Sequence, residues 1–185
     1  GGGSSDAAAT IKALVKLWDI KAEKSELERI AAKLGADVPF FLTGGTALCE
    51  GIGDIVTPLR NITRMPIILV NPGFSISTPS VYKQVRLPLT NTIKIHTIKK
   101  LICDGSFNEK DAFNYCFNRL EVYVFPNYPE IAGIKSILTD LGCASLMSGS
   151  GATVFGIFGS ESQSETMNSK LQQYNWTTWL AYPSE

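Results

Sequence analysis

Apolar and polar residues follow patterns that predict two structural parts, residues 1–62 and 63–185, with the segment from Asn61 to Met65 linking them. In the first part, apolar residues recur at helical spacing from Ile11 to Trp18, after polar residues suited to a helix start. This spacing predicts a helix over residues 6–18.

A second helix is predicted just before Gly35. The sequence Ser25-Glu26-Leu27-Glu28 has the form of a capping box, the apolar residues after it fall on one helical face, and Gly35 provides a C-terminal stop. From Thr46 to Leu59, a looser alternation is interrupted by glycine and proline. That pattern predicts two short strands joined by a turn, which would complete the first part.

The second part has the order of elements of a split βαβ domain. The pattern predicts a buried strand over 66–70, a helix from Thr78-Pro79, one amphipathic helix from Phe113 to Val124, another from Ile131 to Leu141, strands over 144–147 and 153–158, a helix over 161–174 and a strand over 176–182. A ferredoxin-like domain has this order, with helices on one face of an antiparallel sheet. The predicted fold class is therefore α+β.

The balance of charged residues argues against some classes of binding partner. The chain has 17 Lys and Arg against 17 Asp and Glu, so no net field attracts it to nucleic acid or to an anionic membrane. Its longest apolar runs have the length of strands, and the N-terminus lacks the basic and apolar blocks of a secretory signal. We expect neither nucleic acid nor a membrane as partner; the sequence does not indicate an oligomeric state.

The cysteines indicate a reducing compartment. None forms a CxxC pair, and all lie within apolar patterns, which favours reduced core thiols over disulfides or a zinc site. The four are Cys49, Cys103, Cys116 and Cys143. A cytoplasmic location is the resulting expectation.

The chain opens on Gly1, Gly2, Gly3, Ser4 and Ser5, directly before the first predicted helix. Glycines allow backbone amides to approach a phosphate closely, the helix dipole adds positive potential, and the two hydroxyls can donate hydrogen bonds or contact a metal ion. The segment is neither a Walker A loop nor a Rossmann fingerprint. A flexible linker is the alternative, although a linker has no need to lead directly into a patterned helix. A phosphate loop that begins at the first residue would also mean an incomplete chain.

Three segments together resemble the GHMP kinases: Gly1–Ser5, the stretch GADVPFFLTGG from Gly35 to Gly45, and SLMSGSGATVFG from Ser145 to Gly156. The resemblance covers nearly the whole chain. It implies the GHMP kinase fold, with residues 1–62 as the remainder of an N-terminal ATP-binding domain and residues 63–185 as the C-terminal domain. It also implies that the upstream half of the ATP phosphate loop, and a lysine beside the catalytic aspartate, are missing from this sequence.

Within the family, the sequence of these segments most resembles one group of kinases. These enzymes transfer the γ-phosphate of ATP to the 2-hydroxyl of a cytidyl diphosphate-linked methylerythritol, in non-mevalonate isoprenoid biosynthesis. ATP is then the expected phosphate donor, with Mg²⁺ holding phosphate charge. No residue of the chain is assigned as a metal ligand. A kinase for another small alcohol, of the homoserine or mevalonate type, and a nucleotide-binding fragment without catalysis are the alternatives. The chain alone is expected to be inactive, with apolar surface left uncovered.

Asp37 is the predicted catalytic residue. Phosphoryl transfer to a hydroxyl needs a carboxylate that orients the hydroxyl and takes its proton, and the resemblance gives Asp37 this role. The structural alternative is that Asp37 only caps a short helix led by Val38-Pro39, and spacing alone favours that interpretation.

The remaining candidates lie in the second part. Ser148-Gly149-Ser150-Gly151 is a predicted tight turn whose free N–H groups can face an anion, and the resemblance places Gly149, Ser150 and Gly151 beside the active site. Thr78 matches a family position near the substrate. The alternatives are a turn that needs glycine only for its geometry and a threonine that only caps a helix. The stretch from Asn118 to Glu121 also matches the family and is interpreted as structural, on an amphipathic helix.

Overall fold

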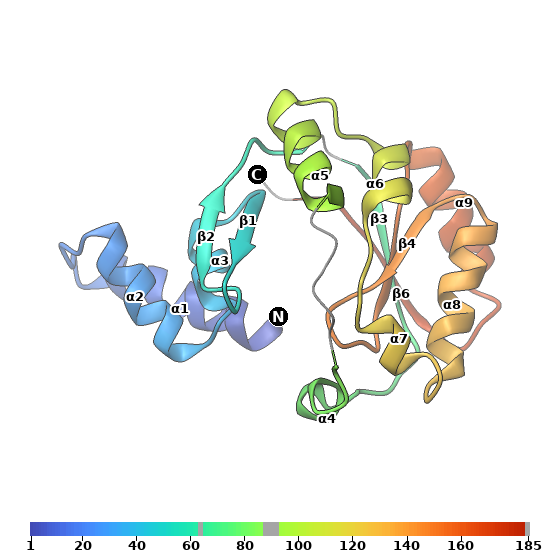
Figure 1. Cartoon of the computed structure of the whole chain (residues 1–185), viewed down its shortest axis with the longest axis horizontal. Coiled ribbons are helices and arrows are strands. Elements are labelled where there is room, and N and C mark those ends of the chain that lie inside the picture. Colours follow the sequence, from blue (N-terminus) through green and yellow to red (C-terminus); the bar gives the residue numbers. More distant parts are fainter. Residues whose placement is uncertain (63–64, 87–92, 184–185) are drawn as a thin grey trace. The chain divides into compact units, whose positions relative to one another are not determined.

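The computed structural model describes residues 1–62, 65–86 and 93–183 (Figure 1). These residues form two compact units, of which unit 1 is Gly1–Asn61 and unit 2 begins at Ile62. The assignment of functional domains to the two units stays a prediction.

Unit 1 consists of three helices and a β-hairpin. Its elements are α1 (Gly2–Leu17), α2 (Lys24–Leu34), α3 (Val38–Thr43), β1 (Ala47–Glu50) and β2 (Ile55–Pro58), the two strands being antiparallel. The core of the unit is small and is centred on Ala8, Ala31 and Val38, one residue from each helix. Alanine at two of these positions allows the helices to approach closely, so α3, which follows the predicted catalytic residue, packs against α1 and α2.

The start of α1 differs from the prediction. The helix begins at Gly2 rather than at residue 6, so Gly2 to Ser5 form its first turn and not an open loop. The Ser5 hydroxyl donates to the carbonyl oxygen of Gly2 over 2.7 Å and so stays within this turn. The residues after Ser5 favour a helix, and each glycine added at its N-terminus lowers helix stability by only about 1 kcal/mol relative to alanine.

The predicted capping box in α2 is wrong. The helix begins at Lys24 after Glu23, and no side chain caps it. The carbonyl oxygen of Glu23 already accepts the amide hydrogens of Glu26 and Leu27, at 3.0 and 3.2 Å. Ser25 therefore lies inside the helix, and the amide of Leu27, which its hydroxyl would cap, already donates to Glu23.

Unit 2 is built on a four-stranded antiparallel sheet. The strands are β3 (Ile67–Asn71), β4 (Ala144–Met147), β5 (Val154–Ile157) and β6 (Thr177–Ala181), in the order β4-β5-β3-β6. Helix α8 (Pro129–Asp140) packs on β4 and β5, and α9 (Glu161–Leu171) packs on β3 and β6 (Figure 1). This order of strands is that of the ferredoxin-like split βαβ plan, and the predicted α+β class is confirmed.

The core of unit 2 follows from the two periodicities of its elements. On β3, Ile68 and Val70 are fully buried, whereas the alternate residues, Ile67, Leu69 and Asn71, are half-buried on the opposite face. On α8, Ile131, Ile134 and Leu138 are fully buried, which matches the predicted face. The buried residues of β3 and α8 belong to the same core. The spacing of apolar residues along the strand and along the helix therefore predicts this part of the fold correctly.

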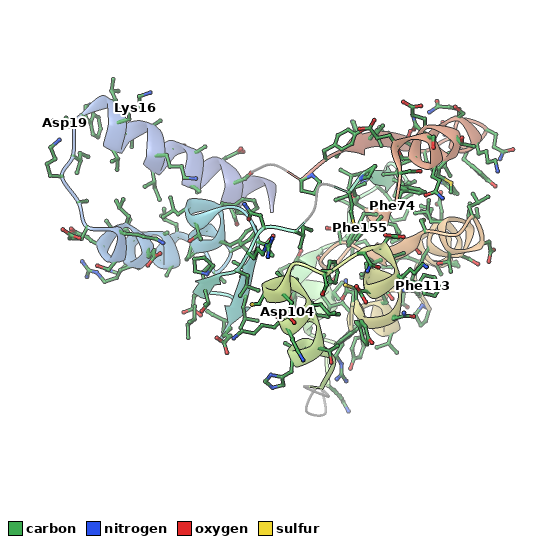
Figure 2. The ribbon with its side chains drawn as sticks, turned by 90° about the horizontal axis from the view of Figure 1, so that it is seen from above. Lys16, Asp19, Phe74, Asp104, Phe113 and Phe155 are labelled. Atoms are coloured by element: carbon green, nitrogen blue, oxygen red, sulfur yellow. The ribbon has the colours of Figure 1, made fainter. Side chains whose placement is uncertain are left out.

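One predicted helix of unit 2 is divided in the structure. The remaining helices are α4 (Thr78–Tyr82), α5 (Ile93–Asp104), α6 (Glu109–Tyr115) and α7 (Glu121–Val124). The pattern predicted a single helix from Phe113 to Val124, but α6 ends at Tyr115 and α7 starts only at Glu121. Phe113, expected on a buried face, is 57% exposed (Figure 2). The side chain of Asn118 makes hydrogen bonds to other parts of the backbone, and these replace the helix at this point.

Much of the apolar face predicted for unit 1 is exposed. Leu17, Trp18 and Leu34 are 74%, 65% and 62% exposed, although the pattern places Trp18 and Leu34 on buried helix faces. This agrees with the expected uncovered apolar surface, while poor solubility of the chain alone stays a prediction. In the ranges that the structure describes, no helix is both long and apolar enough to cross a bilayer.

Candidate active site

Asp37 lies just before α3, and its carboxylate is exposed. Although Asp37 occupies the N-cap position, its side chain makes no capping hydrogen bond. Its backbone angles, φ −85° and ψ −11°, are helical rather than extended, and an extended conformation is what an N-cap side chain needs to reach the helix amides. The carboxylate is therefore available to a substrate.

The turn of the β1–β2 hairpin lies against this carboxylate. A Cβ placed on Gly53 would be 3.5 Å from Oδ1 of Asp37, and Gly53 has a φ of +108° that side chains rarely permit. The backbone of the turn thus approaches Asp37 as closely as a glycine allows. The hairpin supplies one wall of the space around the carboxylate.

Cys49, on β1, lies close enough to Asp37 for the charge of the carboxylate to affect its thiol. Partial removal from water raises the pKa of the Cys49 thiol, and the negative charge of Asp37 raises that pKa further. The thiol is nevertheless exposed and open to reagents. Cys49 can therefore report on the position and charge of Asp37 without any measurement of activity.

Replacing Asp37 with asparagine is expected to speed the alkylation of Cys49. Loss of the nearby negative charge lowers the pKa of the thiol, so at pH 7.5 a larger fraction is the reactive thiolate and the rate with iodoacetamide rises about twofold. The rate is measured by mass spectrometry of the peptide that contains Cys49. Asp19→Asn, which removes an exposed charge in the turn after α1 (Figure 2), should leave the rate unchanged. An unchanged alkylation rate in the Asp37 variant would show that the carboxylate of Asp37 is too far from the Cys49 thiol to affect its pKa.

The cysteines only partly match their prediction. All four are free of disulfides, as expected, but Cys49 and Cys103 are exposed rather than in the core. Cys143 is buried; burial raises its pKa to about 12, and its Sγ donates to the carbonyl oxygen of Leu138 over 2.9 Å. Cys143 is thus the inert core thiol that the pattern predicted.

Gly1, which immediately precedes α1, lies against α3. A Cβ on Gly1 would be 3.0 Å from the ring of Phe41, which follows Asp37 by one helical turn and so lies on the same side of α3. The amide groups of Gly2, Gly3 and Ser4 have no acceptor within the helix, since they precede its first hydrogen bonds. Unit 1 thus holds free helix amides and the free carboxylate of Asp37 on parts of the chain that pack together.

In unit 2, the structure brings Thr78 to the predicted turn between β4 and β5. The hydroxyl groups of Thr78 and Ser150 share a hydrogen bond of 2.7 Å, although 72 positions separate them. Helix α4 has no side-chain cap, so the hydroxyl of Thr78 is used for the turn and not for the helix end. Ser150 is buried, so this hydrogen bond lies in a largely water-excluded place.

The turn leaves two adjacent amides free. The amide of Ser148 donates to Thr153 over 2.8 Å, and that of Gly151 donates to Ser148 over 2.9 Å. Within residues 1–62, 65–86 and 93–183, no acceptor is found for the amides of Gly149 and Ser150. Gly149 has a φ of +54° and is exposed. Consecutive amides in such a conformation form a concave site for an anion.

Two residues that support this turn were not predicted. Asn118 donates from Nδ2 to the carbonyl oxygens of Met147 and Gly149, both at 2.7 Å, and Glu121 accepts the amide hydrogen of Met147 at 2.9 Å. Both residues were expected on an amphipathic helix, with only a structural role. An asparagine in the middle of a predicted helix was the signal that could have identified a turn there.

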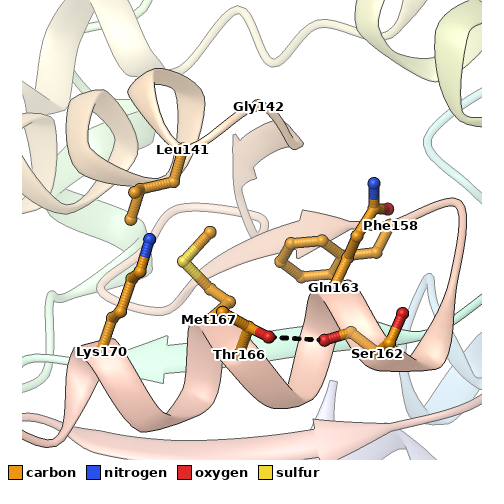
Figure 3. Close-up of a pocket in the computed structure, with 8 residues that line it drawn as sticks. All are labelled: Leu141, Gly142, Phe158, Ser162, Gln163, Thr166, Met167 and Lys170. Carbon is orange, nitrogen blue, oxygen red and sulfur yellow. Dashed lines mark hydrogen bonds between the residues drawn. The ribbon is translucent and has the colours of Figure 1, made fainter.

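A pocket lies elsewhere in unit 2, between the end of α8 and one face of α9 (Figure 3). Its volume is about 330 Å³, with Phe158 and Met167 among its apolar lining and the cationic Lys170 at its edge. The hydroxyl of Thr166 donates to the carbonyl oxygen of Ser162 within the helix. None of the predicted site residues lines this pocket.

We searched the described residues for side chains that could hold a metal ion. Among the described residues, no group of three or more His, Cys, Asp and Glu side chains is placed to hold an ion. A Mg²⁺ ion needs only one or two protein ligands when a substrate supplies phosphate oxygens. The hydroxyls of Ser4 and Ser5 and a bound triphosphate together fit that requirement.

Two protein families match the sequence. Residues 1–45 match the family described as GHMP kinases N terminal domain, and residues 98–175 match GHMP kinases C terminal. A 4-diphosphocytidyl-2-C-methyl-D-erythritol kinase of Syntrophus aciditrophicus is 38% identical over 98% of this chain and 63% of its own length. The enzyme of the same name from Thermodesulfovibrio yellowstonii is 41% identical over 89% of this chain and 59% of its own. The chain thus spans less than two thirds of these relatives.

Solved structures show the same similarity. A crystal structure of 4-(cytidine 5'-diphospho)-2C-methyl-D-erythritol kinase superimposes with a TM-score of 0.79 and 30% identity, over 100% of this chain and 66% of that one. Homoserine kinase from Cytophaga hutchinsonii gives a TM-score of 0.77, and Leishmania major mevalonate kinase, in complex with R-mevalonate, gives 0.66. They cover 98% and 99% of this chain, and 64% and 65% of their own. The last two are 14% and 16% identical, so they show a shared fold alone.

Proposed function

Because the chain belongs to the GHMP kinase family, we propose that it forms part of an ATP-dependent kinase for the 2-hydroxyl of 4-diphosphocytidyl-2-C-methyl-D-erythritol. The predicted GHMP kinase fold is confirmed. The proposal concerns a protein of the relatives' length that carries this chain, called the full-length protein below. In it, residues 1–62 belong to the ATP-binding domain and residues 63–185 form the C-terminal domain. The reaction serves non-mevalonate isoprenoid biosynthesis, and a cytoplasmic location stays a prediction.

The observation that carries the proposal is the uncapped, exposed carboxylate of Asp37 beside the turn at Gly53. The substrate hydroxyl is a weak nucleophile at neutral pH, and a carboxylate within hydrogen-bond reach orients it and takes its proton as the new bond to phosphorus forms. The wall formed by the β1–β2 turn limits where that hydroxyl can lie. Asp37 therefore acts as the catalytic base.

The phosphate donor is held by the first turn of α1. The free amides of Gly2, Gly3 and Ser4 bind phosphate oxygens of ATP, and the positive end of the helix dipole stabilises the negative charge. Gly1, packed on Phe41, and the hydroxyls of Ser4 and Ser5 complete this segment. A bound Mg²⁺ ion would neutralise phosphate charge, with Ser4 and Ser5 as its protein contacts. Positioning and charge stabilisation supply most of the catalysis in such a site.

The turn in unit 2 suits a substrate that carries phosphate groups. The free amides of Gly149 and Ser150 suit a phosphate oxygen, and the cytidyl substrate carries two phosphate groups where homoserine and mevalonate carry none. Thr78 and Gly151 contribute by holding the shape of this turn, since Thr78 bonds Ser150 and Gly151 has a φ of +88°. This feature favours the cytidyl substrate over the two smaller alcohols.

The substrate is tested by measuring ATP consumption by the full-length protein with each of three alcohols. We expect kcat/KM for the cytidyl substrate to exceed that for homoserine or mevalonate by at least about 10³-fold, because a site built for polar groups strongly rejects an acceptor that lacks them. A preference for either small alcohol would reassign the substrate. This chain without additional residues should show no turnover with any of the three.

A further inference from the structure

The turn that presents the amides of Gly149 and Ser150 is held mainly by side chains from one other segment. Asn118 holds two carbonyl oxygens of this region, those of Met147 and Gly149, with both donors of one amide group. Glu121 accepts the amide hydrogen of Met147 through Oε1. We propose that Asn118 and Glu121 are positioning residues, which orient the turn so that the amides of Gly149 and Ser150 bind a phosphate group of the acceptor substrate.

The orientation follows from the geometry of a trans peptide. In the peptide that joins Gly149 to Ser150, the carbonyl oxygen and the amide hydrogen point in opposite directions. Asn118 fixes the carbonyl oxygen of Gly149 at 2.7 Å, so the amide hydrogen of Ser150 must point away from Asn118. Without this bond the peptide plane can rotate, because Gly149 itself permits both signs of φ.

Asn118 is itself fixed in place. Its Oδ1 accepts the amide hydrogen of Leu120 at 2.9 Å, which orients the side chain and leaves both hydrogens of Nδ2 for the turn. Glu121 is held by an ion pair of 2.5 Å between Oε2 and Lys135, from α8, and both side chains are partly buried. The support thus reaches from the turn to a helix whose apolar face lies in the core of unit 2.

The hydrogen bond between Thr78 and Ser150 fixes the other side of the turn. The hydroxyl of Ser150 bonds Thr78, while no acceptor within the described residues takes the hydrogen of its backbone amide. Asn118 and Thr78 therefore bond two adjacent residues of the turn, Gly149 and Ser150, from two segments. The role proposed for them rests on the proposed function, since it assigns the phosphate to the acceptor substrate.

The test measures KM for each substrate in the full-length protein. We expect Asn118→Ala to raise KM for the cytidyl substrate about tenfold, with KM for ATP unchanged, because one of two phosphate-binding amides loses its orientation. Asn118→Asp should have the same effect, since a carboxylate cannot donate to the two carbonyl oxygens. Glu121→Ala should also raise KM for the cytidyl substrate, because the amide hydrogen of Met147 loses its acceptor.

Asn108→Ala is the matched control. Asn108 caps α6 through Oδ1, which accepts the amide hydrogens of Lys110 and Asp111, so its loss destabilises unit 2 without affecting the turn. We expect this variant to melt at a lower temperature and to keep both KM values. If Asn118→Ala behaves as Asn108→Ala does, or raises both KM values equally, the two residues have a structural role only and the inference is overturned.

An NMR measurement separates this inference from the proposed reaction. With ¹⁵N-labelled glycine and serine in the full-length protein, inorganic pyrophosphate should shift the amide signals of Gly149 and Ser150, and Asn118→Ala should abolish the shift of Ser150. A protein that shows these shifts but does not phosphorylate the cytidyl substrate would refute the proposed function alone. Signals that do not respond to pyrophosphate, or that respond equally in the variant, would refute the positioning role.

Discussion

Asp37→Asn in the full-length protein is expected to lower kcat about 10³-fold, the usual scale of a lost general base. Asparagine has nearly the same shape but cannot take the proton of the substrate hydroxyl. Since the Asp37 side chain makes no capping bond, the variant should fold normally and melt within about 1 °C of the unaltered protein. The measurements are steady-state turnover of ATP with the cytidyl substrate, and thermal unfolding of the same samples.

Asp19→Asn is the control for this prediction. Asp19 has a left-handed backbone conformation, φ 48°, which asparagine also tolerates, and its exposed carboxylate pairs with the equally exposed Lys21. This variant should keep its kcat. If Asp37→Asn retained more than about a tenth of the turnover, Asp37 would be removed from the mechanism, because positioning alone does not require a charged base.

Elements that depend on local pattern were predictable from the sequence. Ile131, Ile134 and Leu138 repeat at helical spacing before Gly142, and the structure has α8 there with all three fully buried. The same rule failed from Phe113 to Val124, where the spacing is equally helical. There the bonds from Asn118 to Met147 and Gly149 are made across about 30 positions of sequence, and no periodicity of nearby residues can reveal them.

The candidate site shows the same limit. The segment with Asp37 could be identified from its sequence, and so could the turn from Ser148 to Gly151. The approach of Gly53 to the carboxylate of Asp37 could not, because it depends on how the β1–β2 hairpin folds back on the start of α3. The hydrogen bond between Thr78 and Ser150 is likewise a product of tertiary packing. Sequence thus indicated the reacting groups, and the structure supplied the groups that hold them.

The glycines at the start of α1 allow stability and substrate binding to be separated. Gly3 is inside the helix, and a Cβ placed on it would meet nothing within 4 Å of the protein. Within the chain alone, Gly3→Ala should therefore stabilise the helix by up to about 1 kcal/mol. Such a glycine is unfavourable for folding, which indicates that the space above its Cα is needed for something else.

We expect Gly3→Ala to raise the melting temperature of the full-length protein by about 2 °C and to raise KM for ATP by on the order of 10-fold to 100-fold. The added methyl group occupies the space through which a phosphate oxygen reaches the helix amides. Gly133→Ala is the matched control, since Gly133 lies on α8, also with nothing within 4 Å of an added Cβ. It should stabilise the protein similarly and leave KM for ATP unchanged. Equal behaviour of the two variants would mean that no ligand approaches Gly3, and the phosphate site would have to be placed elsewhere.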